Sequence, residues 1–148
     1  MTIAIRQALI DEVIWINEKY NEIGFALSNF DNEHIAIAEI DGIPVGLGRI
    51  IFMENEVTEL GGIYVFEHYR NQGIARHIVT YLMSKIAKNK KVYCVPFSHL
   101  EDFYCQFGFV KVVSTDEIPQ EIANKYLWCQ QHDCRQVSLL MLPVSKGS

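Results

Sequence analysis

One segment near the middle of the chain combines basic, polar and glycine residues in a pattern that suits the binding of an anion. Its residues are Arg70, Asn71, Gln72, Gly73, Ile74, Ala75 and Arg76. The segment follows an apolar run that ends at Val65 and leads into a helical pattern that begins at Gly73. The free N–H groups and the dipole of a helix N-terminus attract a phosphate, and a glycine lets the phosphate reach the main chain. A plain strand-to-helix turn uses the same residue types, so the segment alone leaves both interpretations open.

The elements that must position this segment are predicted from the spacing of apolar residues. Alternating or continuous apolar runs predict strands, and apolar residues three or four positions apart predict helices. Strands are predicted over residues 2–6, 35–40, 43–52, 57–65, 92–95, 110–113 and 137–142. Helices are predicted over residues 8–20, 73–88 and 119–131. A further helix is expected to open at a capping box of Ser98 and Glu101 and to stop at Gly108.

Two glycine-containing dipeptides predict local geometry within the sheet. Asp41-Gly42 stands between two strand patterns, which is typical of a two-residue type I′ hairpin. Gly61-Gly62 interrupts the strand over residues 57–65 and predicts a bulge or a close approach of a ligand to the backbone.

The order of the predicted elements indicates an α/β fold with a mixed sheet, in a single domain over residues 1–148. Hairpins give antiparallel strand pairs, and the crossover through the helix over residues 73–88 gives a parallel pair. A Rossmann dinucleotide domain is disfavoured. Gly46-Leu47-Gly48 lies inside a predicted strand, and Ile51 occupies the position of the third glycine.

The composition fits a soluble globular domain. Of 148 residues, 49% are hydrophobic and 21% are charged, and a chain of this length can bury a core without a metal or disulfides. The net charge of −5 argues against a nucleic-acid partner, which needs a surplus of lysine and arginine. The sequence shows neither an apolar run as long as a membrane helix nor a signal-peptide pattern, so we expect no membrane partner and a cytoplasmic location.

Charge is distributed unevenly along the sequence. Residues 11–67 hold twelve acids and two bases, a net −10, whereas residues 68–100 hold six bases and no acid, a net +6. This segregation favours an anionic ligand at the basic segment and a cationic ligand at the acidic one. A solvated lysine cluster at a helix end is the alternative explanation of the basic segment.

The four cysteines show no Cys-x-x-Cys spacing and are expected to be thiols. Cys129, His132 and Cys134 are possible metal ligands, but the sequence offers no fourth ligand nearby, so no metal is predicted. Cys94 and Cys105 are expected to be small core residues, because no histidine or acid stands beside either of them at a telling spacing.

Two motifs resemble those of a known family. The residues from Arg70 to Ala75 match the Arg/Gln-x-x-Gly-x-Gly/Ala signature of the GNAT superfamily of acetyl-CoA-dependent N-acetyltransferases. The residues from Phe103 to Phe109 resemble the family's Phe-Tyr-x-x-x-Gly-Phe block, and the element order is similar along nearly the whole chain. The resemblance implies a GNAT-like fold with a mixed, mostly antiparallel central sheet, helices on both faces and a splayed pair of central strands.

The resemblance also implies that acetyl-CoA, or coenzyme A, is the cosubstrate. Backbone N–H groups of Asn71 to Arg76 would bind its pyrophosphate, with added charge from Arg70. Ile63, Tyr64 and Val65 would pair with the pantetheine arm, and an N–H group near Val65 would polarise the thioester carbonyl. Phe97 stands where many relatives carry an asparagine, so one side-chain contact to the cosubstrate is missing.

Two side chains match catalytic positions of the family. Tyr104 matches the tyrosine that protonates the departing thiolate in many relatives, and a phenol suits that role. Glu59 stands eleven residues before Arg70, where several relatives carry a glutamate that acts as general base. Glu59 is also compatible with a solvated strand residue, and Glu54, Glu56 and His34 are alternative bases.

The implied function is direct transfer of an acetyl group to a primary amine, without a covalent enzyme intermediate. The acidic segment favours a small cationic amine or a peptide amine as acceptor. A non-catalytic acyl-CoA-binding or sensing module and a protein or N-terminal acetyltransferase are the alternatives. The apolar run over residues 137–142 could pair across a homodimer as well as within the sheet.

Overall fold

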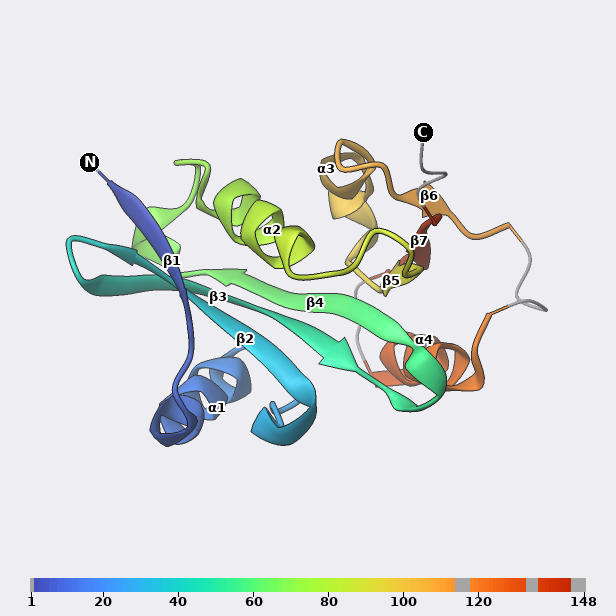
Figure 1. Ribbon diagram of the computed structural model, residues 1–148, viewed down its shortest axis with the longest axis horizontal. Helices are drawn as coiled ribbons and strands as arrows, with labels where there is room; N and C mark the ends of the chain where they lie inside the picture. Colours follow the sequence, from blue (N-terminus) through green and yellow to red (C-terminus); the bar gives the residue numbers. More distant parts are fainter. Residues whose placement is uncertain (1, 114–117, 133–135, 145–148) are drawn as a thin grey trace. The chain divides into compact units, whose positions relative to one another are not determined.

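The computed structural model describes residues 2–113, 118–132 and 136–144 (Figure 1). These residues form two compact units. The first unit comprises Met1–Ile51 and Gly62–Ile86, and the second comprises Phe52–Gly61 and Ala87–Ser148. Because the boundary falls inside a strand, that strand contributes one half to each unit.

The strands and helices follow one another in the predicted order. The strands are β1 (Ile3–Gln7), β2 (Glu33–Ile40), β3 (Ile43–Phe52), β4 (Thr58–Val65), β5 (Val92–Cys94), β6 (Val110–Lys111) and β7 (Leu140–Leu142). The helices are α1 (Val13–Glu22), α2 (Ile74–Ser84), α3 (Glu101–Cys105) and α4 (Gln120–His132). Single 3₁₀ turns are η1 (Ile10–Glu12), η2 (Phe30–Asn32), η3 (Glu54–Glu56), η4 (Glu67–Tyr69) and η5 (Ser98–Leu100).

The strands form a mixed sheet in the order β1-β2-β3-β4-β5-β7-β6 (Figure 1). The pairs β1–β2, β2–β3, β5–β7 and β6–β7 are antiparallel, and β4–β5 is parallel. This confirms the predicted mixed, mostly antiparallel sheet. Within the described residues the β4–β5 ladder covers Thr58↔Val92 and Glu59↔Tyr93, so most of β4 extends beyond it, as expected of a splayed pair.

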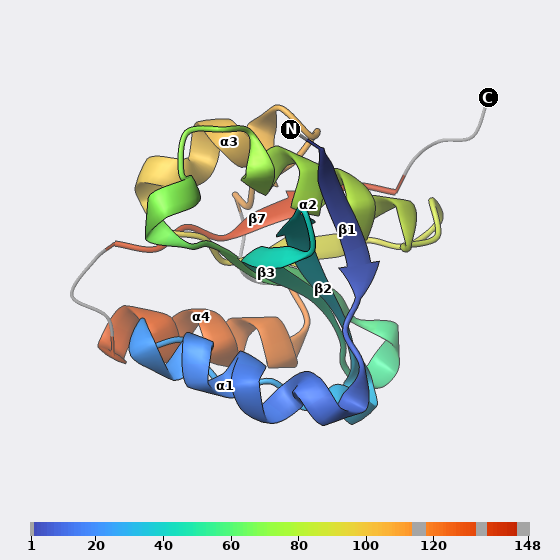
Figure 2. The ribbon, with the colours of Figure 1, turned by 90° about the vertical axis from the view of Figure 1, so that its left-hand side faces the viewer.

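In the first unit, helices cover both faces of the sheet (Figures 1 and 2). Ile16 and Tyr20 of α1 form a buried cluster with Ile35, Ile37 and Leu47 of β2 and β3. The opposite face carries Gly46 and Gly48, which lie against Ile78 and Leu82 of α2. Successive strand residues face opposite sides of a sheet, so bulky residues meet α1 while glycines let α2 lie close to the strands.

In the second unit, α3 and α4 lie on opposite sides of β5 and β7 (Figures 1 and 2). Ile122 of α4 is fully buried in a cluster with Val57, Tyr93 and Leu139. Tyr104 of α3 packs edge-to-face against Phe103 and Phe109. This unit therefore carries both the tyrosine and the glutamate that the sequence predicted as catalytic residues.

Local predictions are confirmed at the turns but not at the start of α3. Asp41 and Gly42 both have positive φ, +51° and +79°, as a type I′ hairpin requires. The predicted capping box of Ser98 and Glu101 is wrong, because η5 precedes α3 and no side chain caps the helix. The Ser138 hydroxyl donates to the Glu101 carboxylate instead.

The run over residues 137–142 forms a shorter strand than predicted, β7, which pairs with β5 on one side and β6 on the other. Pairing within the sheet, one of the two possibilities that the sequence left open for this run, therefore occupies both edges of β7. The described part of the chain holds no helix that could span a membrane.

The fit between α2 and the sheet generates a stability prediction. A methyl group at Gly48 would lie 2.5 Å from Ile78 Cγ2 and 2.9 Å from Ile63 Cδ1. We expect Gly48→Ala to lower the free energy of unfolding by about 1–3 kcal/mol, because the packed side chains must move. Urea unfolding of the variant and of wild type measures this difference in free energy. In the control Gly61→Ala, the nearest atom to the new methyl is Glu59 Oε2 at 3.4 Å, an ordinary contact. A Gly48→Ala protein as stable as wild type contradicts this packing.

Candidate functional site

The glycine pair of β4 is irregular, as predicted. Gly62 lies inside the strand with a φ of +61°, in the left-handed region. The Tyr20 hydroxyl donates to the Gly62 carbonyl at 2.7 Å. A methyl group on Gly62 would lie 2.7 Å from both the Tyr20 hydroxyl and Arg49 Nε. Position 62 therefore needs glycine both for its backbone angle and for its space.

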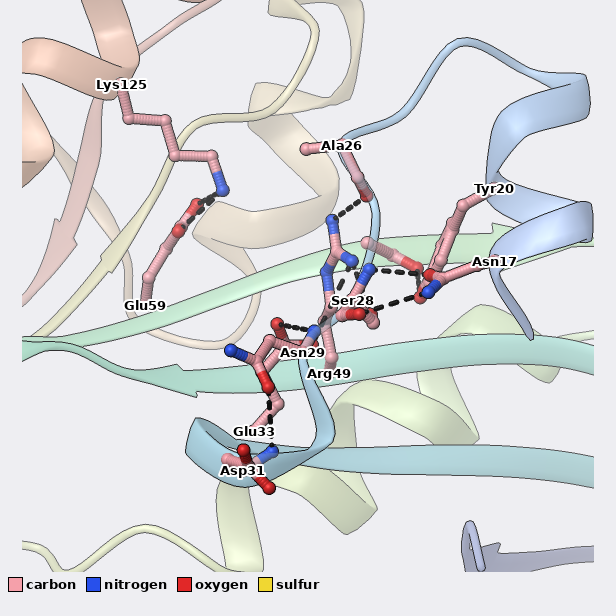
Figure 3. A network of polar contacts seen from close by, with 11 residues as sticks. Asn17, Tyr20, Ala26, Ser28, Asn29, Asp31, Glu33, Arg49, Glu59 and Lys125 are labelled. Atoms are coloured by element: carbon pink, nitrogen blue, oxygen red, sulfur yellow. Dashed lines mark hydrogen bonds and ion pairs between the residues drawn. The ribbon is translucent and has the colours of Figure 1, made fainter. Parts of the chain in front are cut away.

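Arg49 of β3 holds the surroundings of Gly62 together (Figure 3). Its side chain is 3% exposed, and its guanidinium lies 4.4 Å from the centre of the Tyr20 ring. It donates to Ser28 Oγ at 2.5 Å and to the Ala26 carbonyl at 2.9 Å. Glu33 provides the counter-charge, 3.9 Å from Nη1. This network ties the segment after α1 to β3 and to Gly62 in β4. Burial raises the pKa of the Tyr20 hydroxyl.

The second half of β4 carries the residues that were expected to pair with pantetheine. Ile63, Tyr64 and Val65 are half-buried. The strand then ends where the Phe66 N–H donates to the Val45 carbonyl at 2.9 Å. Arg70 folds back, and its Nε donates to the Val65 carbonyl at 3.1 Å. The basic segment is thus joined directly to the end of β4.

The predicted anion-binding segment forms an exposed turn followed by a helix. Asn71 and Gly73 are left-handed, with φ of +65° and +80°, and Gly73 is the N-cap of α2. Arg70, Asn71, Gln72 and Gly73 are exposed, whereas Ile74 anchors the helix in the core. The bond from His77 N–H to the Gly73 carbonyl, 3.2 Å, is one of the first in the helix. The preceding amides, Ile74 to Arg76, have no acceptor within the helix.

This turn fits a phosphate group. A side-chain atom placed on Gly73 would meet nothing within 4 Å, so the approach to the amides is open. The first turn of α2 contains no acidic residue, and Arg76 is exposed within it. The Arg70 guanidinium has further N–H donors beyond the one bound to Val65. The amides of a helix N-terminus, the helix dipole and two arginines form a donor set that phosphates prefer.

Glu59 occupies a very different environment in the second unit (Figure 3). It lies in the first half of β4, is 1% exposed and stands in register with Tyr93 of β5. Lys125 of α4 places its ammonium 2.6 Å from each carboxylate oxygen. The alternative of a solvated strand residue is therefore wrong, because Glu59 is a buried member of an ion pair.

Tyr104 lies in the same unit as Glu59 and is 4% exposed. It forms a hydrogen bond with the thiol of Cys94, the last residue of β5. Burial raises the pKa of that thiol well above its ordinary value, and the Glu59 carboxylate raises it further. Cys94 is thus a buried neutral thiol, which confirms the expectation of a core residue, whereas Cys105 is exposed and the same expectation is wrong for it.

The structure therefore groups the predicted site residues in two sets. Ile63 to Val65 and Arg70 to Arg76 lie in the first unit, and Glu59 and Tyr104 lie in the second, joined through Cys94. Sequence analysis missed Lys125, which lies 66 residues from Glu59. The described residues contain no group of three potential metal ligands, and Cys134 of the considered zinc set lies outside them.

The chain is similar to proteins of known family in sequence and in fold. A family model described as an acetyltransferase (GNAT) domain matches residues 31–111, more than half of the chain. Among curated protein sequences, none matches significantly.

Solved structures show the same fold at low sequence identity. N-acetylglutamate synthase from Neisseria gonorrhoeae, complexed with coenzyme A and N-acetyl-glutamate, has a TM-score of 0.69 at 18% identity. The match covers 99% of this chain and 36% of that one, so this chain spans about a third of the synthase.

Two shorter proteins match over their full length. Rv2747 from Mycobacterium tuberculosis, solved in complex with CoA, has a TM-score of 0.70 at 17% identity over 96% of this chain and 99% of that one. Escherichia coli ElaA has a TM-score of 0.67 at 14% identity over 95% and 99%. The family match and the shared fold agree, and the chain belongs to the GNAT family of acetyltransferases.

Proposed function

We propose that the chain is an N-acetyltransferase that moves the acetyl group of acetyl-CoA directly to a primary amine. The observation that carries this proposal is the open, left-handed start of α2 at Gly73, directly after β4 and η4, in a chain of the GNAT family. Acetyl-CoA is the cosubstrate that GNAT enzymes use, and two of the similar structures contain coenzyme A. When bound, it supplies an acetyl thioester that an amine can attack.

The cosubstrate is held by the first unit in this proposal. The amides from Asn71 to Arg76 bind its pyrophosphate, and the Arg70 and Arg76 side chains add charge. Backbone groups of Ile63, Tyr64 and Val65 pair with its pantetheine arm. Polar backbone groups of a strand are obligatory hydrogen-bonding partners, so the stretch of β4 beyond its described ladder with β5 suits an extended, amide-containing ligand.

Tyr104 and Glu59 carry the proton transfers. Tyr104 donates its phenolic proton to the leaving sulfur. Glu59 takes a proton from the acceptor, because only an unprotonated amine can attack. Because Lys125 already forms an ion pair with Glu59, an external amine must approach the same carboxylate beside Lys125. Cys94 takes no covalent part, because its raised pKa keeps it a neutral thiol and a poor nucleophile.

The acceptor is a small cationic amine or a peptide amine, and the reaction takes place in the cytoplasm. Exposed acids of the segment over residues 11–67, such as Glu54 and Glu67, support this acceptor class through long-range attraction. N-acetyl-glutamate is bound in the synthase from Neisseria gonorrhoeae, so amino acids belong in any panel that tests the acceptor.

Turnover tests the function and the role of Tyr104 together. We expect release of free thiol from acetyl-CoA in the presence of pooled amines and peptides, with cationic acceptors preferred. Tyr104→Phe should lower kcat about a hundredfold with little change in the KM for acetyl-CoA, because it removes a proton donor but keeps the ring. Cys94→Ala is the control and should retain transfer. Loss of transfer in Cys94→Ala with activity kept in Tyr104→Phe would show that transfer is not direct.

The cosubstrate site has its own test. Gly73→Ala should weaken coenzyme A binding about tenfold or more in calorimetry, because a side chain at φ +80° distorts the turn that presents the amides. Gly42→Ala is the matched control: Gly42 has a φ of +79° and equally open surroundings but lies in the β2–β3 hairpin. Equal coenzyme A affinities of the two variants would contradict the assignment of the α2 turn.

A further inference from the structure

Lys125 brings a primary amine of the chain itself to Glu59. Its ammonium lies 2.6 Å from both oxygens of that carboxylate, which is the geometry that a general base needs toward the amine that it deprotonates. The Lys125 side chain is 24% exposed, whereas the Glu59 side chain is 2% exposed. The amine therefore stands between a buried carboxylate and the surface of its unit.

The proton donor of the proposed reaction belongs to the same cluster. The pKa of the Cys94 thiol is affected by Tyr104, Glu59 and Lys125, so Cys94 lies near all three of these side chains within the second unit. Lys125 is held there by α4, which Ile122 anchors in the core one helical turn earlier. The base, an amine and the acid are thus assembled without any external acceptor.

Net stabilisation by an ion pair is a weak explanation of the contact between Lys125 and Glu59. Buried salt bridges contribute little net stability, because desolvation of the two charges offsets their attraction. The pair here is also asymmetric, since one partner is buried and the other is partly exposed. A partly exposed amine beside a buried base can receive an acyl group with little movement of the chain.

We propose that Lys125 is a self-acetylation site, at which the chain transfers an acetyl group from acetyl-CoA to its own amine. This proposal rests on the proposed acetyltransferase function. It adds a modification site on α4 and identifies a lysine side chain, presented on a helix, as an acceptor that Glu59 serves.

Acetyl transfer to Lys125 needs one base and one acid. The Lys125 ammonium gives one proton to the Glu59 carboxylate, and the free Nζ forms a bond to the acetyl carbon as the carbon–sulfur bond breaks. Tyr104 gives its phenolic proton to the sulfur and recovers a proton from Nζ. The products are N-acetyl-Lys125 and the thiol of coenzyme A, and Glu59 releases its proton to solvent. The amide that forms is neutral, so Glu59 loses its counter-charge.

The test uses the full chain with isotopically labelled acetyl-CoA and no added amine, and follows the label at each lysine by peptide mass spectrometry. We expect Lys125 to acquire label about a hundredfold faster than the exposed Lys88, because general-base catalysis supplies factors of this size. Glu59→Gln and Tyr104→Phe should each remove this advantage. Tyr104→Phe keeps the ion pair, so it tests the chemistry even if Glu59→Gln does not fold.

Controls separate self-acetylation from chemical labelling and from the proposed function. Lys88→Arg should leave labelling at Lys125 unchanged, and Lys125→Arg should abolish the fast phase. Labelling of Lys125 no faster than of Lys88, or equally fast in Tyr104→Phe, overturns the inference. Thiol release with pooled external amines is measured in parallel. Turnover without labelling of Lys125 overturns the inference alone, whereas absence of both overturns the proposed function as well.

Discussion

The left-handed backbone at Gly62 is the constraint on which both halves of β4 depend. Tyr20 donates a hydrogen bond to the Gly62 carbonyl, and Arg49 fills the space that a side chain would take, so this backbone conformation is fixed from outside the strand. The boundary between the two compact units falls between Gly61 and Gly62. Before it, β4 pairs with β5 and buries Glu59; after it, β4 leads through Val65 to the turn at α2. Gly62 thus separates the half of β4 that holds Glu59 from the half that leads to the turn at the start of α2.

Ion pairs compensate part of the negative charge that residues 11–67 carry. Of the twelve acids over residues 11–67, six form ion pairs, namely Glu12, Glu22, Glu33, Glu39, Glu56 and Glu59. The other six are exposed, namely Asp11, Glu18, Asp31, Asp41, Glu54 and Glu67. Paired charges are compensated at short range, and exposed ones are screened within about 8–10 Å at physiological salt. Long-range attraction of a cation by this segment therefore comes from the six exposed acids and not from the full formal charge of the segment.

Features that depend on neighbouring residues could be predicted from the sequence. The order of strands and helices, the Asp41-Gly42 hairpin and the irregularity at Gly61-Gly62 follow from local apolar spacing and glycine geometry. Contacts between distant residues could not. Lys125 contacts Glu59 although the two are 66 residues apart in the sequence. Ser138 donates a hydrogen bond to the carboxylate of Glu101, 37 residues away, so this carboxylate does not form the predicted capping box. Burial of Glu59 and the acid beside Cys94 depend on the same tertiary packing, for which a single sequence carries no local signal.

We propose that the start of α2 and the end of β4 hold the cosubstrate. The most direct measurement is an NMR titration of the amide signals with coenzyme A. The account predicts that the largest shifts occur at Gly73 to Arg76 and at Ile63 to Val65, and that they saturate together with a single affinity. Saturating coenzyme A that leaves these amides unchanged, or that perturbs only other segments of the chain, would contradict it.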